Sequence, residues 1–213
     1  DEQALDVPPL PAWVDNPAPK EPEPARPLAP SRPSMAEPAI RPPLGDDSGI
    51  AFQRGLLVHR MLQTLPDVAR QARARAARDF LARPVHRLDQ DSINELLAET
   101  FAVLNHPDYA DLFGPKSRAE APVAGVIGAT AISGRIDRLV VGTDIVKVLD
   151  FKTNRPPPLK SGDVSPVYIR QMAAYRSLLE KIYKNHTIEC ILLWTDGPRL
   201  MPLNAKLLDA YAP

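Results

Sequence analysis

The spacing of apolar residues divides the chain into helical and extended segments. Apolar side chains recur every three or four residues in three regions, which predict a first helix from Asp47 or Ser48 to Leu65, a second over 66–83 and a third over 91–104. The second region is rich in Ala, the residue with the strongest helix propensity, and the third has a regular apolar face. The first part of the folded chain is therefore expected to be helical.

After the third helix the apolar residues follow the shorter period of a strand. A strand is expected over 122–132, leading into a hairpin over 134–153, and a later strand over 187–194 is expected to be buried on both faces. A helix is predicted over 167–183, and a short helix from Asn204 closes the chain. This order of elements predicts an α/β fold in which helices pack around a small central sheet.

A Pro-rich segment precedes these elements. Residues 1–43 hold about half of the 25 prolines, with Glu, Arg and Ala between them. Because such a segment lacks backbone donors and apolar mass, we expect residues 1–45 to form an extended linker and residues 46–213 to form one folded domain. The linker is interpreted as a tether to an upstream domain, and the alternative is a tail without a function. The absence of an initial Met favours a piece of a longer protein.

Composition removes several classes of function. The chain has 26 basic and 26 acidic residues and a net charge of +0, which argues against capture of nucleic acid by bulk electrostatics. Its one cysteine, Cys190, excludes an intrachain disulfide and any zinc or iron–sulfur site built from several thiolates. No apolar run approaches the roughly 20 residues of a membrane span, and no signal peptide is visible. We therefore expect a cytoplasmic protein without a membrane partner.

The hairpin over 134–153 carries the main candidate chemistry. Side chains alternate along a strand, so Asp150 and Lys152 must lie on the same face. If the turn consists of residues 143–144, Asp137 lies opposite Asp150, whereas a slip of one residue would send Asp137 to the other face. Two carboxylates and a lysine on one surface are suited to holding a divalent cation beside a phosphate.

A second interpretation of the same residues stays open at this point. Asp150 could form an exposed ion pair with Lys152 or Arg135, which would contribute only about 0 to 1 kcal/mol. Against this, Asp150 ends an apolar run that indicates a buried strand, and a buried carboxylate requires a compensating cation. A phosphate-binding loop is excluded because Phe151 and Val146 occupy the required Gly positions, and no GxSxG nucleophile motif occurs.

Four short motifs, in order, resemble a known family. They are G-L-L-V-H-R, G-R-I-D-R, V-L-D-F-K-T-N-R-P-P and Y-I-R-Q-M-A-A-Y-R. Together they resemble the RecB-like branch of the PD-(D/E)XK nucleases and, more closely, the C-terminal nuclease domain of bacterial AddA helicase-nuclease subunits. The resemblance covers about Gly45 to the end. It implies a restriction-endonuclease-like core, with a small central mixed sheet flanked by helices, behind N-terminal helices and the Pro-rich linker.

The resemblance also implies a metal site. It places His59, Asp137 and Asp150 as ligands of a divalent metal, with the Phe151 carbonyl as a further oxygen ligand. Asp137, Asp150 and Lys152 are the implied catalytic residues, and Lys152 would orient the attacking water or stabilise charge on the phosphate. Mg²⁺ is the expected metal and Mn²⁺ a possible substitute, because the donors are mostly oxygen atoms. An iron–sulfur cluster, which some related nucleases hold, is not expected here.

Three further residues match weaker parts of the family pattern. Gln171 and Tyr175 match a Q-x-x-x-Y helix that contacts DNA or positions Lys152, and Glu120 matches an upstream acid. His59, Tyr175 and Gln171 each have a simpler explanation when taken alone. His59 would be an ordinary helix histidine, Tyr175 a core residue and Gln171 a solvent-exposed residue.

The implied function is that of a metal-dependent DNA exonuclease domain. The resemblance places it in a helicase-nuclease that resects double-strand breaks for recombinational repair, with ATP used only by the helicase portion. Its implied partners are DNA, upstream helicase domains of the same chain and a second, AddB-like subunit. The alternatives are a catalytically silent scaffold that binds a partner subunit and a stand-alone metal nuclease. The intact Asp137, Asp150 and Lys152 set counts against a silent scaffold.

Overall fold

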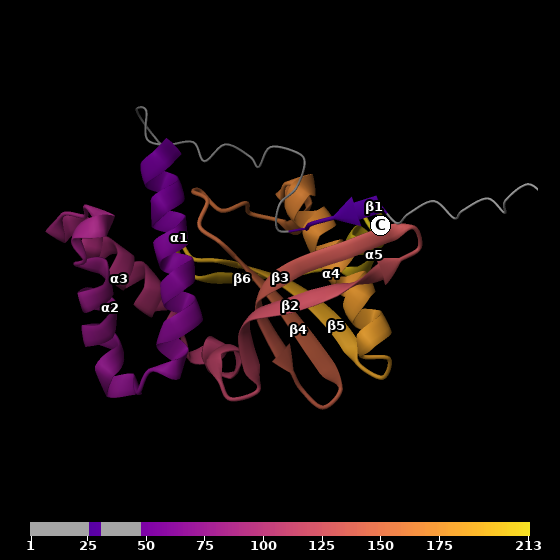
Figure 1. Ribbon diagram of the computed structural model, residues 1–213, viewed down its shortest axis with the longest axis horizontal. Helices are drawn as coiled ribbons and strands as arrows, with labels where there is room; N and C mark the ends of the chain where they lie inside the picture. Colours follow the sequence, from indigo (N-terminus) through magenta and orange to yellow (C-terminus); the bar gives the residue numbers. More distant parts are fainter. Residues whose placement is uncertain (1–25, 31–47) are drawn as a thin grey trace, which may run out of the picture.

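The structure, a computed structural model, describes residues 26–30 and 48–213. Within these residues the chain forms one six-stranded sheet in the order β1-β3-β4-β5-β6, with β2 paired to β3 outside this path (Figure 1). The β1–β3 and β4–β5 pairs are parallel and the other pairs are antiparallel, so the sheet is mixed. The strands are β1 Arg26–Leu28, β2 Ser117–Ile127, β3 Thr130–Val141, β4 Ile145–Lys152, β5 Thr187–Trp194 and β6 Arg199–Leu203.

Helices cover both faces of this sheet. The α-helices are α1 Ser48–Thr64, α2 Arg73–Leu81, α3 Gln90–Leu104, α4 Pro166–Ile182 and α5 Ala205–Asp209. Short 3₁₀ segments occur at η1 Leu65–Asp67, η2 Arg70–Ala72, η3 Pro84–His86, η4 Pro107–Phe113 and η5 Ser161–Asp163. Helices α1, α2 and α3 gather on one side of the molecule, and α4 and α5 lie on the other (Figure 1). No helix in the described part of the chain is both long and apolar enough to cross a membrane.

The alternation of β4 divides the interior into two cores. Leu149 and Phe151 belong to the core that α1, α2 and α3 form on one face. Val148 packs into the core on the other face, with Met172 of α4 and Leu192 of β5. Because both faces are covered, the central strands are apolar along most of their length. The predicted α/β fold, a central mixed sheet flanked by helices, is confirmed.

The hairpin between β3 and β4 has the predicted register. Arg138 pairs with Leu149, and the Gly142 N–H donates to the Ile145 carbonyl at 2.9 Å, which leaves a two-residue turn at 143–144. A Cβ on Gly142 would lie 2.9 Å from that carbonyl oxygen, so a residue without a side chain suits this close approach. The register prediction, on which the shared face of the two acids depends, is confirmed.

The prediction of one continuous strand over 122–132 is wrong. The chain reverses inside that range, because β2 ends at Ile127 and β3 begins at Thr130, directly opposite it. Gly128 makes this turn with φ +57°, a left-handed conformation that glycine adopts without strain. The apolar run across the turn contains no strongly polar turn residue, so its periodicity could not separate one strand from two.

The helix predicted over 66–83 is wrong in its first half. Two 3₁₀ turns occupy this part, and a continuous α-helix begins only at Arg73. Val68 is extended, with ψ 140°. The Arg73 guanidinium donates to the carbonyls of Val68 and Pro66 at 3.0 and 2.8 Å. These side-chain bonds satisfy carbonyl groups that a continuous helix would pair internally.

Strands β1 and β6 were not predicted. β6 pairs with the end of β5, and β1 pairs in parallel with residues 130–132 of β3. β1 lies inside the Pro-rich residues 1–45, of which the structure describes only 26–30. The expected boundary at residue 45 lies outside the described residues.

Candidate active site

Asp137 lies where β4 separates from β3. The regular pairing of these strands ends at Arg138 and Leu149, one residue before the two acids would face each other. The Asp137 side chain continues the connection, because its Oδ2 accepts a hydrogen bond from the Phe151 N–H at 2.7 Å. The carboxylate is thus held between the two strands, beside the Phe151 main chain.

Asp150, Lys152 and Gln171 form a buried polar cluster. Asp150 is 4% exposed, and its Oδ2 lies 2.5 Å from Lys152 Nζ. Gln171, which reaches down from α4, donates from Nε2 to Asp150 Oδ1 at 2.9 Å and accepts from Lys152 Nζ at 3.4 Å. The ion pair is therefore buried. Since a buried pair is tolerated only where further hydrogen bonds satisfy it, the amide of Gln171 stabilises both charges.

Tyr168 is a residue of this cluster that sequence reasoning missed. Lys152 Nζ lies 3.8 Å from the centroid of the Tyr168 ring, in cation–π geometry. The Tyr168 hydroxyl donates to Asn154 Oδ1 at 3.0 Å, just beyond the end of β4. Its place three residues before Gln171, on the same face of a helix, was a signal that could have identified it. Tyr168 and Gln171 together restrict the position of the ammonium group.

His59 approaches Asp137 from α1. His59 Nδ1 lies 3.5 Å from Asp137 Oδ2, and the imidazole meets the Phe151 ring edge-on at a centroid distance of 5.6 Å. Burial lowers the pKa of His59, and the Asp150 carboxylate opposes this shift. The net direction favours the neutral imidazole, which is the form that binds metals.

The titration of Asp137 and of Lys152 is shifted by burial and by the charge of Asp150. Burial raises the pKa of Asp137 well above its usual value, and the charge of Asp150 adds to the shift. Desolvation acts to lower the pKa of Lys152, but the Asp150 carboxylate reverses this, and the net pKa is raised. Lys152 is therefore a cation at neutral pH. A further positive charge near Asp137 would relieve the repulsion between the two carboxylates.

The donor groups fit a divalent metal. Asp150 Oδ2 is buried and, although paired with Lys152, accepts no hydrogen bond of regular geometry, so it retains capacity for a cation. Carboxylates with an imidazole and a backbone carbonyl suit Mg²⁺ or Mn²⁺. Among the described residues, no three His, Cys, Asp or Glu side chains already stand in metal-binding geometry.

Glu120 and Tyr175 both contact Arg135, two residues before Asp137 on β3. The β2–β3 register places Glu120 next to Asp137 on the neighbouring strand, but its φ of +50° interrupts the pairing there. Its carboxylate lies 3.7 Å from the Arg135 guanidinium. Tyr175 is fully buried and its hydroxyl donates to the Arg135 carbonyl at 2.9 Å. This hydrogen bond connects α4 to β3.

A buried carboxylate behind the site connects α1 with the loop after β4. Glu99 of α3 accepts hydrogen bonds from Arg54 of α1, from Arg155, whose Nη2 lies 2.9 Å away, and from the Thr195 hydroxyl. Arg54 precedes His59 by five residues on the same helix, and Arg155 follows Lys152 by three. No sequence motif pointed to Glu99, because its partners are far away along the chain.

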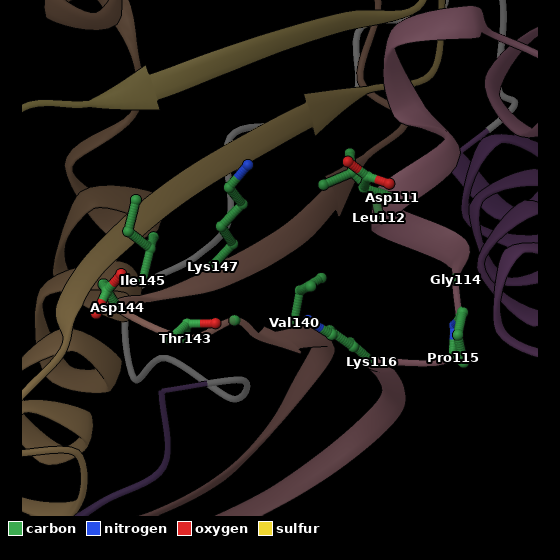
Figure 2. A pocket seen from close by; sticks show the side chains of 11 residues that line it. Asp111, Leu112, Gly114, Pro115, Lys116, Val140, Thr143, Asp144, Ile145 and Lys147 are labelled. Atoms are coloured by element: carbon green, nitrogen blue, oxygen red, sulfur yellow. The ribbon is translucent and has the colours of Figure 1, made fainter.

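A pocket of about 470 Å³ lies beside His59 and Lys152. His59, Phe151 and Lys152 line it together with exposed side chains of α1 and with Arg135. A second hollow, of about 520 Å³, lies at the turn of the β3–β4 hairpin, where Lys147 extends beside the turn (Figure 2). Its lining reaches Val140 and Lys147, which are three residues, or roughly 10 Å, from Asp137 and Asp150 along the strands, but it includes none of the candidate catalytic or metal-binding residues. The chemistry therefore belongs to the first pocket.

Comparison with known proteins identifies the family. The family model for the PD-(D/E)XK nuclease superfamily matches residues 38–200, well over half of the chain. No curated protein sequence matches the chain. A solved structure titled "Crystal structure of SSO0001" is 15% identical, with a TM-score of 0.32, over 75% of this chain and 82% of that chain, a likeness too weak to carry a conclusion. The family match is sufficient, and this chain belongs to the PD-(D/E)XK nuclease superfamily.

Proposed function

We propose that this domain hydrolyses phosphodiester bonds in DNA with a bound divalent metal, Mg²⁺ or Mn²⁺. The observation that carries the proposal is the buried Asp150–Lys152 pair, with Asp137 held beside it at the fork between two strands. Family membership supports a nuclease, and the geometry supports this pocket as its site.

In this proposal, His59, Asp137, Asp150 and the Phe151 carbonyl hold the cation. A bound divalent cation supplies positive charge that polarises a phosphate oxygen and lowers the pKa of a coordinated water. Asp137 must be ionised for this role, so below its raised pKa the binding of a cation would release a proton.

In this proposal, Lys152 contributes its positive charge to stabilising the transition state. Because its pKa is raised, it stays protonated and cannot serve as the general base. Gln171 and Tyr168 hold the ammonium group at the pocket wall, where it can donate hydrogen bonds to the phosphate or to the attacking water. A preorganised cation of this kind stabilises the charge that develops in the transition state.

The larger context of the proposal is a helicase-nuclease that resects double-strand breaks for recombinational repair in the cytoplasm. The AddA-like motifs support it, and so does the net charge of +0, since a domain that receives its strand from a motor needs no basic surface to capture DNA. Residues 1–45 would then link the nuclease to upstream helicase domains, which alone would use ATP. An AddB-like subunit would be the second protein partner.

The test compares cleavage of linear DNA by the parent protein and by Lys152→Ala in Mg²⁺. We expect cleavage to fall by about 100-fold or more, the effect of removing a preorganised charge. Lys147→Ala, on the same strand but at the other hollow, is the matched control and should cleave normally. Because the first change leaves Asp150 without its buried partner, folding is checked by circular dichroism, and Lys152→Met preserves the packing. Normal cleavage by a folded Lys152 variant would refute the assignment.

A further inference from the structure

Helix α1 carries an apolar ridge that the core does not use. Its inner face packs Leu57, Val58 and Met61, which are buried. Phe52 and Leu56 lie one turn apart on an outer face and are 62% and 56% exposed. Two large apolar side chains on the solvent side of an amphipathic helix are unfavourable unless they meet a ligand or a partner. We call Phe52 and Leu56 the outer ridge.

The outer ridge leads into the candidate active site. Phe52, Leu56 and His59 follow one another at helical spacing, and all three line the pocket that contains Lys152. His59 follows Phe52 by seven positions, so the ridge extends about 10 Å from the metal-binding position. At about 3.4 Å per stacked nucleotide, this distance is the length of roughly three nucleotides.

Cations accompany the ridge in the same pocket. Arg60 follows on α1, and its guanidinium donates to Gln63 at 2.7 Å. Arg135 reaches into the pocket from β3, with Glu120 as an ion-pair partner at 3.7 Å. An apolar wall with arginines beside it matches a single nucleic acid strand, which presents base faces on one side and phosphates on the other. A duplex hides its base faces and would leave the ridge without a partner.

We propose that Phe52 and Leu56 form a base-contacting wall that binds the nucleobases of an unpaired strand next to the phosphate to be cut. This inference rests on the proposed nuclease function. The wall makes binding depend on the presence of bases but not on their identity, because every base offers an apolar face. It positions the strand so that the following phosphate lies beside Lys152.

The experiment separates binding from cleavage. The protein is titrated, in metal-free buffer, with a fluorescent single-stranded oligonucleotide and with an abasic oligonucleotide of the same length. We expect tighter binding of the strand with bases, and we expect Phe52→Ala to weaken that binding about 10-fold while leaving the abasic strand nearly unaffected. Leu56→Ala should act in the same direction. Leu159→Ala removes a leucine that is 83% exposed and lies outside the pocket, and it should change neither titration.

A fluorescence measurement tests directly whether the side chain at position 52 contacts the bases. In Phe52→Trp, stacking on a base should quench the new indole emission when the normal oligonucleotide is added, but not when the abasic strand is added. Because both positions are exposed, these variants should fold, and circular dichroism checks that they do.

The outcomes also distinguish this inference from the proposed function. Suppose that DNA is cleaved with Mg²⁺, but Phe52→Ala weakens the binding of both oligonucleotides equally or leaves both unchanged. The base-contacting wall is then refuted, while the nuclease assignment stands. An indole at position 52 that is already shielded without DNA, and unchanged by it, would mean that protein covers the ridge and would also refute the proposal. If no DNA is cleaved or bound, the nuclease assignment itself fails.

Discussion

The Glu99 cluster allows the effect of one substitution on stability to be worked out from the structure. Glu99→Ala removes the carboxylate shared by Arg54, Arg155 and Thr195. Loss of one partner of a buried ion pair costs about 3–5 kcal/mol, because the other charge is left uncompensated. The side chains of Arg54 and Arg155 are 20% and 42% exposed, so water can replace part of what they lose. We therefore expect the free energy of unfolding to fall by about 2–4 kcal/mol.

The expected change is large enough for standard measurements. For a domain of this size, each kcal/mol shifts the melting temperature by roughly 2–4 °C, so Glu99→Ala should melt about 5–15 °C lower. Urea unfolding followed by circular dichroism measures the free energy directly. Double-mutant cycles with Arg54→Ala and Arg155→Ala then divide the loss between the two ion pairs.

Glu95→Ala is the matched control. Glu95 also pairs with Arg54, at 3.1 Å, but its carboxylate is exposed. An exposed pair contributes about 0–1 kcal/mol, so this variant should stay near the parent protein. If Glu99→Ala destabilises no more than Glu95→Ala, then the burial-based reasoning is wrong, and Glu99 does not hold α1 to the loop after β4.

Three more predictions follow from single observations. Mn²⁺ affinity should rise as pH rises through the raised pKa of Asp137, because below that pKa a proton competes with the metal for the carboxylate; calorimetric titrations showing no pH dependence would contradict this. Burial raises the pKa of Cys190 to about 12, so the native thiol should resist a disulfide reagent at pH 8 and react only after unfolding. The contribution of the buried, protonated Cys190 thiol to stability is complete below about pH 9 and is lost as pH rises toward 12. Rapid reaction of the folded protein with the disulfide reagent would argue against this burial. Gly134→Ala should cost about 1–3 kcal/mol in urea unfolding, because its Cβ would lie 2.9 Å from the buried Tyr175 ring, whereas Gly162→Ala meets no atom within 4 Å and should be nearly neutral.

Local patterns were enough to predict several elements of the fold. The helix over 91–104, the helix over 167–183 and the strand over 187–194 each lie within one residue of the observed bounds. The β3–β4 register followed from a two-residue turn and the alternation of strand side chains. In each case the signal and the structure lie within the same short segment, so no distant contact was needed to decide the outcome.

The surroundings of the catalytic candidates depended on distant contacts. Sequence spacing placed Asp150 and Lys152 on one face and, with a two-residue turn, Asp137 opposite Asp150, and the family resemblance added His59 and Gln171. Neither showed that Gln171 bonds to both charges of the pair, nor that Tyr168 stacks on the ammonium group. These contacts join α4 to β4, and only the packing of the helix on the sheet decides their distances.

The sequence by itself determined that this chain builds an α/β domain with two acids and a lysine on one hairpin. Tertiary structure decided where the hairpin opens, because regular pairing stops at Arg138 and the Asp137 side chain takes its place. It also decided that the ion pair is buried and that the outer ridge of α1 faces the same pocket. The physical reason is that strand register is a local property of a turn, whereas burial, pKa shifts and pocket walls arise from segments that meet only after folding.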